Sequence, residues 1–232
     1  DAWSQKAEFG GTARYSAVGF SIGDKGYIGT GVSRGWGSYY PYQVEKDFWQ
    51  YDPVLNIWTQ KADFGGTARC GAVAFVIKNR GYVGTGEWKE NDFWEYNPSN
   101  DSWTRKADFS GEERTEAVAF SIGNKGYIST GRDGIMSDIA YKDLWEYSPL
   151  TDTWAKKADF GGGGRCGAFA FSIGNKGYLG AGNDFKDALP FNPLQDFWEY
   201  NSEDDTWLKK EDFGGGLRGN AVAFSITGKG YA

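Results

Sequence analysis

The 232-residue sequence predicts an all-β fold built from repeated four-stranded units, and three observations support this. A phrase such as KADFGGTAR at 61–69 occurs five times, and each copy ends in an arginine 45 to 55 residues after the previous one. Between the copies, short apolar or aromatic runs alternate with turn residues in a constant order. No segment shows a helical period of apolar residues. Units of about 50 residues and four strands are typical of β-propeller blades.

The first two strands of each unit follow its arginine directly. Runs such as AVAFSI at 117–122 are short, apolar and bounded by turn residues, as expected for strands buried on both faces. The next segment is a tight turn such as GNKG at 123–126. We expect its Asn and Lys to form a type I turn, with the second Gly in the left-handed position of a bulge. A second strand such as GYIGTG at 26–31 then ends in glycine.

The third and fourth strands form a hairpin with a fixed register. The aromatic run DFWEY at 92–96 has the composition and length of one strand, and NPSNDSW at 97–103 has the Asn, Pro and Asp that turns favour. A tryptophan in the third strand is followed nine residues later by another in every complete unit, which implies a constant pairing. The fourth strand is charged, as suits an outer edge that must not pair with other molecules.

The two ends of the chain carry pieces of a further unit. Residues 3–9 have the sequence of a fourth strand, and residues 217–232 that of a first strand and the start of a second. The sequence therefore predicts one domain over 1–232, with four complete blades and a partial fifth shared by the termini. Because the fifth unit has no DFWEY strand, either the ring closes imperfectly with five blades or the chain is part of a larger propeller, and the stop after Tyr231 favours the second expectation.

The repeat resembles that of the kelch family of β-propellers. The glycine-ended second strand, the third strand with its Tyr, and the turn from Asp52 to Trp58 carry the resemblance, which extends over essentially the whole chain. It implies four-stranded blades around a central channel, with binding on the face that carries the loops after the second strands. A likeness to secreted bacterial kelch proteins, together with the absent initiator Met, implies a secreted or cell-surface location, or a periplasmic one.

Composition excludes several classes of function. The net charge of −6 gives no general electrostatic reason to bind nucleic acid, and no apolar run is long enough to insert into a membrane. The chain has no histidine, so we expect no metal and no cofactor, and the copper chemistry of galactose oxidase, a kelch enzyme, does not carry over. Cys70 and Cys166 occupy the same place in the repeat and are predicted to be buried, small apolar residues.

The five arginines are the first candidate site residues. Strand order places them near the mouth of the channel, and the kelch resemblance implies that residues at such positions grip acidic groups of a partner. The alternative is structural, since an arginine in every unit suggests that every blade needs one. The arginines are Arg14, Arg69, Arg114, Arg165 and Arg218.

The loops between the second and third strands are the second candidate. They differ in length and hold aromatic residues outside the repeat pattern, which suit a sugar or a protein partner unless the loops bury these rings themselves. These loops cover 32–46, 87–91, 132–142 and 183–195. The candidate binding residues in them are Trp36, Tyr39, Tyr40, Tyr42, Trp88 and Phe185, with Phe191 as a further aromatic.

One unit departs from the repeat in charge. Its connection, FSGEER at 109–114, holds Glu112 and Glu113, and Glu116 follows Arg114 by two residues. Carboxylates beside an arginine are able to act as acid and base or to hold a hard cation. The alternative is that they are solvated loop charges without a function of their own, which balance the arginine. These four residues are the candidates for catalysis.

Together these observations favour a non-catalytic binding module that presents variable loops and an arginine ring to a protein or glycan partner. A sugar-active enzyme of the mutarotase or epimerase type, which the kelch resemblance also allows, is one alternative. A structural subunit of a larger surface assembly is the other.

Overall fold

The chain folds into four-stranded antiparallel sheets arranged as propeller blades. The computed structural model describes residues 2–34, 43–88, 90–134, 136–185 and 192–232, which contain strands and turns, with no helix that could cross a membrane. Blade 1 consists of β1 (Val18–Ile22), β2 (Lys25–Gly29), β5 (Phe48–Asp52) and β6 (Ile57–Lys61). Blade 2 consists of β7 (Val73–Ile77), β8 (Arg80–Gly84), β9 (Phe93–Asn97) and β10 (Ser102–Lys106).

The remaining sheets continue this order. Blade 3 consists of β11 (Val118–Ile122), β12 (Lys125–Ser129), β13 (Leu144–Ser148) and β14 (Thr153–Lys157). Blade 4 consists of β15 (Phe169–Ile173), β16 (Lys176–Gly180), β19 (Phe197–Asn201) and β20 (Thr206–Lys209). Two strands of a fifth blade follow, β21 (Phe224–Ile226) and β22 (Lys229–Tyr231). Two small hairpins pair β3 (Val32–Arg34) with β4 (Gln43–Val44) and β17 (Asn183–Asp184) with β18 (Asn192–Pro193).

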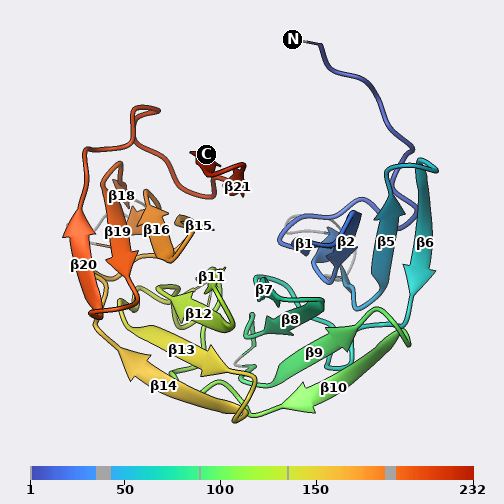
Figure 1. Cartoon of the computed structure of the whole chain (residues 1–232), viewed down its shortest axis with the longest axis horizontal. Coiled ribbons are helices and arrows are strands. Elements are labelled where there is room, and N and C mark those ends of the chain that lie inside the picture. The colour runs from blue at the N-terminus through green and yellow to red at the C-terminus, as the bar shows by residue number, and fades with distance from the viewer. Residues whose placement is uncertain (1, 35–42, 89, 135, 186–191) are drawn as a thin grey trace.

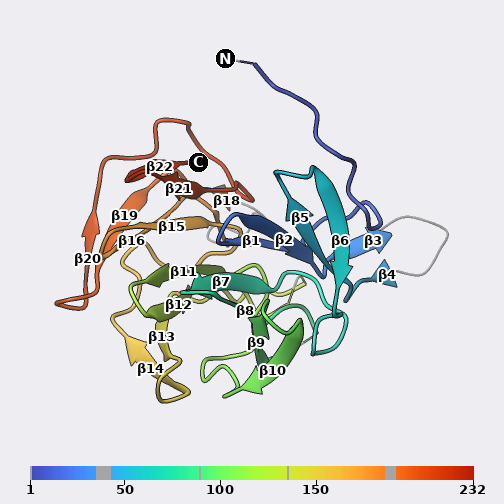
Figure 2. The ribbon, with the colours of Figure 1, turned by 45° about the vertical axis from the view of Figure 1, so that its right-hand side comes forward.

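The blades surround a central axis, with the first strand of each blade innermost (Figure 1). Strands β1, β7, β11, β15 and β21 follow one another around this axis, and each blade packs face to face on the next. The arrangement is open between β21–β22 and blade 1, where the N-terminal segment leads away from the ring (Figures 1 and 2). The predicted β-propeller with four complete blades and the beginning of a fifth is therefore confirmed.

The contribution of the N-terminus to the fifth blade differs from the prediction. Residues 2–9 lie outside any strand, and β21–β22 forms a two-stranded sheet in the described chain. A fourth strand pairs with a third strand in each complete blade, and the fifth unit has no third strand to offer. Residues 7–9 nevertheless contact blade 1, because Trp58 donates a hydrogen bond to the Ala7 carbonyl and its ring lies 5.0 Å from that of Phe9.

The hairpins between first and second strands also differ in turn type. In the register of β11 and β12, Ile122 pairs with Lys125, so the turn has only two residues, Gly123 and Asn124. Gly123 has φ +57°, whereas Asn124 has no positive φ, which is the pattern of a type II′ turn with glycine first. The left-handed glycine is thus the first of the phrase GNKG, and its second glycine lies within β12.

Neighbouring blades are joined by a clamp that repeats around the ring. In the turn between β9 and β10, Asp101 has φ +51° and accepts hydrogen bonds from the Tyr96 hydroxyl (2.8 Å) and from the Ala62 amide of blade 1 (3.0 Å). Trp103 completes the clamp by donating to the Ala62 carbonyl at 3.1 Å. Asp152 and Asp205 repeat these contacts at the next two junctions. The second tryptophan of each nine-residue pair is therefore a junction residue.

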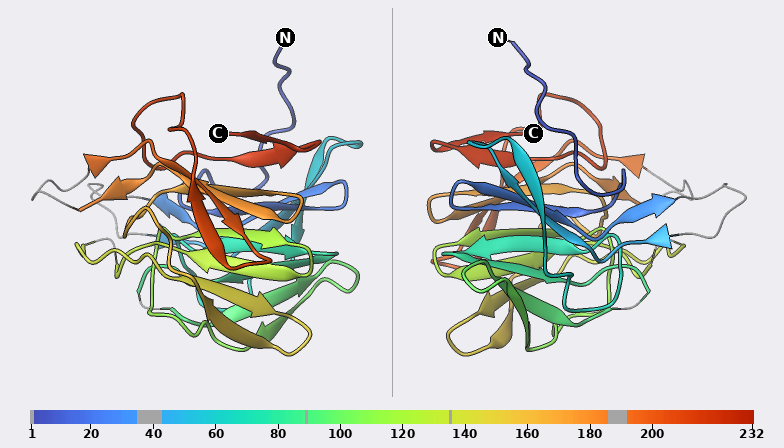
Figure 3. Two further views of the ribbon diagram at one scale, coloured as in Figure 1. Left: turned by 60° about the vertical axis from the view of Figure 1, so that its left-hand side comes forward. Right: turned by 90° about the vertical axis from the view of Figure 1, so that its right-hand side faces the viewer.

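The variable loops share a face with the glycine–arginine connections, as the strand order predicts. Isolated bridges join Tyr15 to Val32, Thr115 to Arg132 and Cys166 to Asn183, each linking the residue after an arginine to the first residue of a loop. The hairpins β3–β4 and β17–β18 project from this same side of the ring (Figure 3). We call this side the loop face.

Candidate functional site

The arginines of the repeat form a structural latch within each complete blade. Arg114 is 1% exposed and binds both carboxylate oxygens of Asp143, at 2.6 and 2.9 Å. Its guanidinium group also donates to the carbonyls of Glu112 and Thr130, and it lies 4.9 Å from the centre of the Phe109 ring. Asp143 in turn accepts a hydrogen bond from the Trp145 indole. The latch thus joins the connection between blades to the start of the third strand.

The same latch recurs in the other three complete blades. The corresponding pairs are Arg14 with Asp47, Arg69 with Asp92 and Arg165 with Asp196. Because both sides of each guanidinium fork are engaged inside the blade, we assign these arginines to structure and leave them out of the candidate site. In the described residues of the partial fifth blade, Arg218 bonds carbonyls of its own connection, since no third strand supplies an aspartate.

The latch aspartates make the stability of the fold sensitive to acid. Burial raises the pKa of Asp143, but hydrogen bonds from Arg114 and Trp145 outweigh this effect and hold the pKa below its usual value. A carboxylate with a depressed folded-state pKa contributes stability above its unfolded pKa near 3.8, and this contribution is lost as the pH falls through the folded value. Asp47, Asp92 and Asp196 are shifted in the same direction.

We therefore expect the urea midpoint to fall as the pH is lowered below about 4, with a smaller dependence between pH 4 and 7. Urea titrations at pH 7, 5, 4 and 3 measure this change. Asp143→Asn removes one of the four latch carboxylates, so it should show a smaller fall between pH 4 and pH 3. An identical fall in this variant would contradict the assignment to the latch.

A ring of left-handed residues surrounds the mouth of the channel on the loop face. One residue from each unit takes part, two positions after the arginine, and all five have φ between 52° and 65°. Their backbones are bonded in sequence around the axis by N–H to C=O bonds of 2.7 to 3.2 Å. The ring members are Ser16, Gly71, Glu116, Gly167 and Asn220. Glycine and asparagine suit this conformation, whereas glutamate rarely adopts it.

Glu116 is the one charged member of this ring. It lines a cavity of about 550 Å³ at the channel mouth, where its neighbours on both sides are glycines. Its carboxylate forms an ion pair with Arg132, with 2.9 Å between Oε2 and Nε, although the angle is not that of a hydrogen bond. The side chains of Glu116 and Arg132 are 27% and 7% exposed, so the pair is largely removed from solvent.

Cys166 lies beside this ion pair. Burial, followed by the charge of Glu116 and a hydrogen bond to it, raises the pKa of the Cys166 thiol to about 12. The thiol therefore stays protonated at neutral pH and is a poor nucleophile. Cys70 is also buried, as predicted for a small apolar residue, and neither cysteine forms a disulfide.

Further charged residues extend the cluster across blades 2 to 4. Glu87 is 8% exposed and lies beside Gly134, in the loop that begins with Arg132. Asp184 is 5% exposed and accepts a hydrogen bond from Asn192. We define the mouth cluster as Glu87, Glu116, Arg132, Cys166 and Asp184. Only Glu116 was a sequence candidate. For Glu87 and Arg132, the available signal was a charged side chain at the first loop position, where blade 1 has Val32.

Two of the predicted loop aromatics, Trp88 and Phe185, lie near this cluster. Trp88 is 50% exposed and has φ +67°, a conformation that is an outlier for a bulky residue. The Phe185 ring lies 5.8 Å from the guanidinium carbon of Arg132 and so belongs to the rim of the cluster. Trp36, Tyr39, Tyr40, Tyr42 and Phe191 lie outside the described residues.

The remaining carboxylates of the odd connection do not join the cluster. Glu112 is exposed, Glu113 is half-buried, and Arg114 is engaged in its latch. Of the four catalytic candidates, the described structure thus brings only Glu116 to the cavity. In the described part of the chain, no group of three or more Cys, Asp or Glu side chains is placed to hold a metal ion.

Comparison with known proteins supports the fold without assigning a family. No protein-family model matches the sequence, and no curated protein does either. The chain superposes on the solved structure of YjhT with a TM-score of 0.83, over 99% of this chain and 79% of that one. The two sequences are 18% identical, so the likeness concerns the fold alone.

Proposed function

We propose that this chain is a kelch-type propeller that binds a protein or glycan partner through its loop face, as a non-catalytic module at the cell surface or in secreted form. The Glu116–Arg132 pair at the channel mouth is the observation that carries the proposal. The attraction between the two charges of a largely buried ion pair seldom offsets the free energy of removing them from water, so such a pair adds little to the stability of the fold. The other units place Ser, Gly or Asn at the position of Glu116. Glutamate also fits the left-handed backbone poorly.

The mouth cluster offers a charged acceptor at a cavity. Glu116 lines a cavity large enough for a sugar ring or an amino-acid side chain and supplies carboxylate oxygens there, while Arg132 pairs with this carboxylate at 2.9 Å. Trp88 and Phe185 add aromatic surface at the rim. Aromatic faces next to polar groups are common in sites that bind sugars or protein hot spots.

We expect the protein to bind members of a printed array of defined glycans, and Glu116→Gln to weaken the signal at least tenfold. This size corresponds to the loss of one hydrogen bond to a charged group, about 1.5–3 kcal/mol. Fluorescence of the labelled protein across a concentration series provides the measurement.

The matched control for this experiment is Glu203→Gln. Glu203 lies in an exposed turn on the opposite face, so its replacement should leave the array signal unchanged. Equal signals for wild type and Glu116→Gln would contradict the placement of the site. If no glycan binds, the glycan half of the proposal fails, and a protein partner remains to be sought with the same two variants.

A second candidate function is catalysis of sugar anomerisation or epimerisation, and one observation favours it. The Glu116 carboxylate lines the cavity with a cation at 2.9 Å, which suits proton transfer next to a developing negative charge. Faster anomer exchange of free hexoses in NMR spectra with the protein than without it would distinguish catalysis from binding alone.

A further inference from the structure

Two kinds of hairpin turn form the side of the ring opposite the loop face, which we call the turn face. One kind joins the first strand of a blade to the second, and the other joins the third strand to the fourth. In blade 1 the two turns are held together by an ion pair of 2.9 Å between Lys25 and Asp52. In blade 4, Asn175 of one turn donates a hydrogen bond of 2.7 Å to Glu203 of the other.

In blade 3 the two turns are separate, and a cavity lies between them and blade 2. No hydrogen bond or ion pair joins residues 123–125 to residues 148–150 in the described chain. The cavity has a volume of about 700 Å³, which is within the range of ligand sites. We define the turn-face cleft by six of the residues that line it, Lys78, Arg80, Asn124, Lys125, Ser148 and Leu150.

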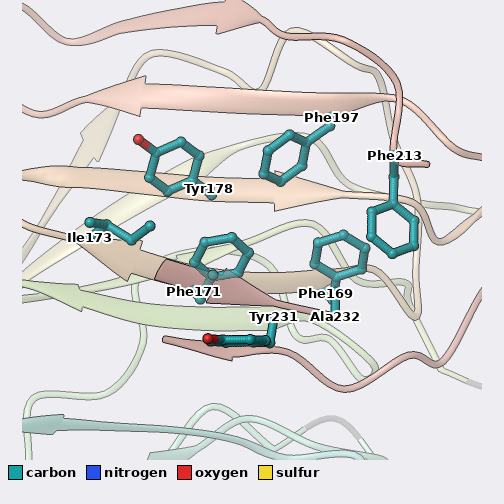
Figure 4. A pocket seen from close by; sticks show the side chains of 9 residues that line it. Phe169, Phe171, Ile173, Tyr178, Phe197, Phe213, Tyr231 and Ala232 are labelled. Atoms are coloured by element: carbon teal, nitrogen blue, oxygen red, sulfur yellow. The ribbon is translucent and has the colours of Figure 1, made fainter. Parts of the chain in front are cut away.

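The character of this cleft differs from that of a smaller cavity in blade 4. That cavity, of about 300 Å³, lies between aromatic rings that include Phe171, Tyr178 and Phe197 (Figure 4). Its walls are mainly aromatic, whereas charged and polar side chains form most of the lining of the turn-face cleft. The cleft is therefore the better candidate for a polar ligand.

The turn between β7 and β8 departs from the repeat where it borders the cleft. Lys78 is the first residue of this two-residue turn and has φ +54°, at the position that is glycine in the other three complete blades. Lysine is strained in this left-handed conformation, whereas glycine is not. Arg80 likewise occupies a position that is lysine in the other units. Blade 2 thus brings an extra cation and a guanidinium fork to the cleft.

The cations of the cleft retain unused binding capacity. Lys78 is exposed and has no ion-pair or hydrogen-bond partner among the described residues. Arg80 lies 3.4 Å from Glu95 through Nε and donates from Nη1 to a carbonyl of its own turn, so its Nη2 has no partner in the described chain. Lys125 lies 3.4 Å from Glu146. Three cations thus face two carboxylates, and the cleft keeps a net positive charge.

An apolar rim and two polar groups stand beside these cations. Leu150 is 93% exposed, at the position that is Ser99 in blade 2. The Asn124 amide and the Ser148 hydroxyl have no hydrogen-bond partner among the described residues. Tyr82, the one aromatic residue in the lining, is 2% exposed, so the cleft does not offer the exposed ring face on which sugars stack.

We propose that the turn-face cleft binds an acidic peptide segment of a partner protein, in which Asp or Glu lies next to a large apolar residue. The peptide carboxylate accepts hydrogen bonds from Lys78 and from Nη2 of Arg80, and the apolar side chain packs on Leu150. A single phosphate or sulfate ion would leave most of a cavity of about 700 Å³ empty. The site lies on the opposite face from the mouth cluster and does not depend on its function.

A displayed library of random seven-residue peptides tests the proposal. The comparison protein carries Lys78→Gly and Arg80→Lys, which give its turn the sequence GNKG found at 123–126 and 174–177. This double variant should keep the urea midpoint of the wild type or exceed it, because glycine relieves the left-handed strain. Peptides enriched on the wild type should carry Asp or Glu within two positions of a large apolar residue. On the double variant, their enrichment should be at least tenfold lower, because the charge-assisted hydrogen bonds are lost.

One enriched peptide, labelled with fluorescein, then gives affinities by fluorescence anisotropy. Leu150→Ser should weaken binding about fivefold, since apolar contact is lost at the rim. Two control variants should leave the affinity unchanged. Val54→Ser removes the exposed apolar residue at the same position of blade 1, and Lys176→Gln removes one positive charge from a turn of blade 4. Glu116→Gln should also leave it unchanged, which separates this site from the mouth cluster.

Three outcomes would overturn the proposal. The first is a library that yields no acidic peptides, or that yields the same peptides on the double variant as on the wild type. The second is an equal loss of affinity in Leu150→Ser and Val54→Ser. The third is binding of a sulfated hexasaccharide that is lost in the double variant while no peptide binds, which would assign the cleft to an anionic glycan instead.

Discussion

Arg114→Ala is expected to lower the free energy of unfolding by about 3–5 kcal/mol, because it leaves the Asp143 carboxylate in a largely buried site without its ion-pair partner. The variant also loses two hydrogen bonds to backbone carbonyls and the packing on Phe109. Urea unfolding followed by tryptophan fluorescence measures the change. Arg114→Lys keeps the charge but loses the planar fork, so it should fold with an intermediate loss of stability.

The control for the latch is a pair of the same residue types on the surface. Arg105 and Asp108 lie 2.9 Å apart with side chains more than half exposed. Arg105→Ala is therefore expected to leave the urea midpoint within error, since solvent-exposed ion pairs contribute little. Equal effects of Arg114→Ala and Arg105→Ala would show that the buried fork is not a stabilising element, and the arginine ring would again be open to a role in binding.

The second large effect is expected from Phe93→Ala, which should lower the free energy of unfolding by about 3–5 kcal/mol. Phe93 is 0% exposed and lies between Phe75 and Tyr82 of its own blade and Tyr147 and Trp154 of the next. Its removal leaves a cavity at a closed junction, where the packed sheets have little freedom to collapse.

Phe197 offers a matched comparison at the same position of blade 4. It is half-buried, and its described ring contacts are to Phe169, Phe171 and Tyr178 within its own blade. Phe197→Ala should therefore lower the free energy of unfolding by less than half as much as Phe93→Ala. Equal losses would indicate that Phe197 has a further packing partner in solution.

The fold was predictable from the sequence because its repeat is dense. Five copies of one phrase, together with the paired tryptophans, predict the strands, their order and the loop face. The turn of GNKG was predicted wrongly because its two glycines are equivalent in the sequence. Only the pairing of Ile122 with Lys125 identifies Gly123 as the left-handed residue.

The functional assignment was less predictable. The arginines were correctly placed near the loop face, but the sequence could not show whether their forks were free. Asp143 lies 29 residues from Arg114 in the chain and belongs to a different strand, so its role as partner appears only when the blade is folded. The partnership of Glu116 with Arg132 was likewise hidden, since 16 positions and a hairpin separate them.

The sequence by itself determined the architecture of this protein, because most of the strand, turn and junction residues recur at the same place in each complete unit. The tertiary structure decided which charges are structural and which stand at the channel mouth. That distinction depends on burial and on distances between side chains in different blades, which a one-dimensional pattern does not contain.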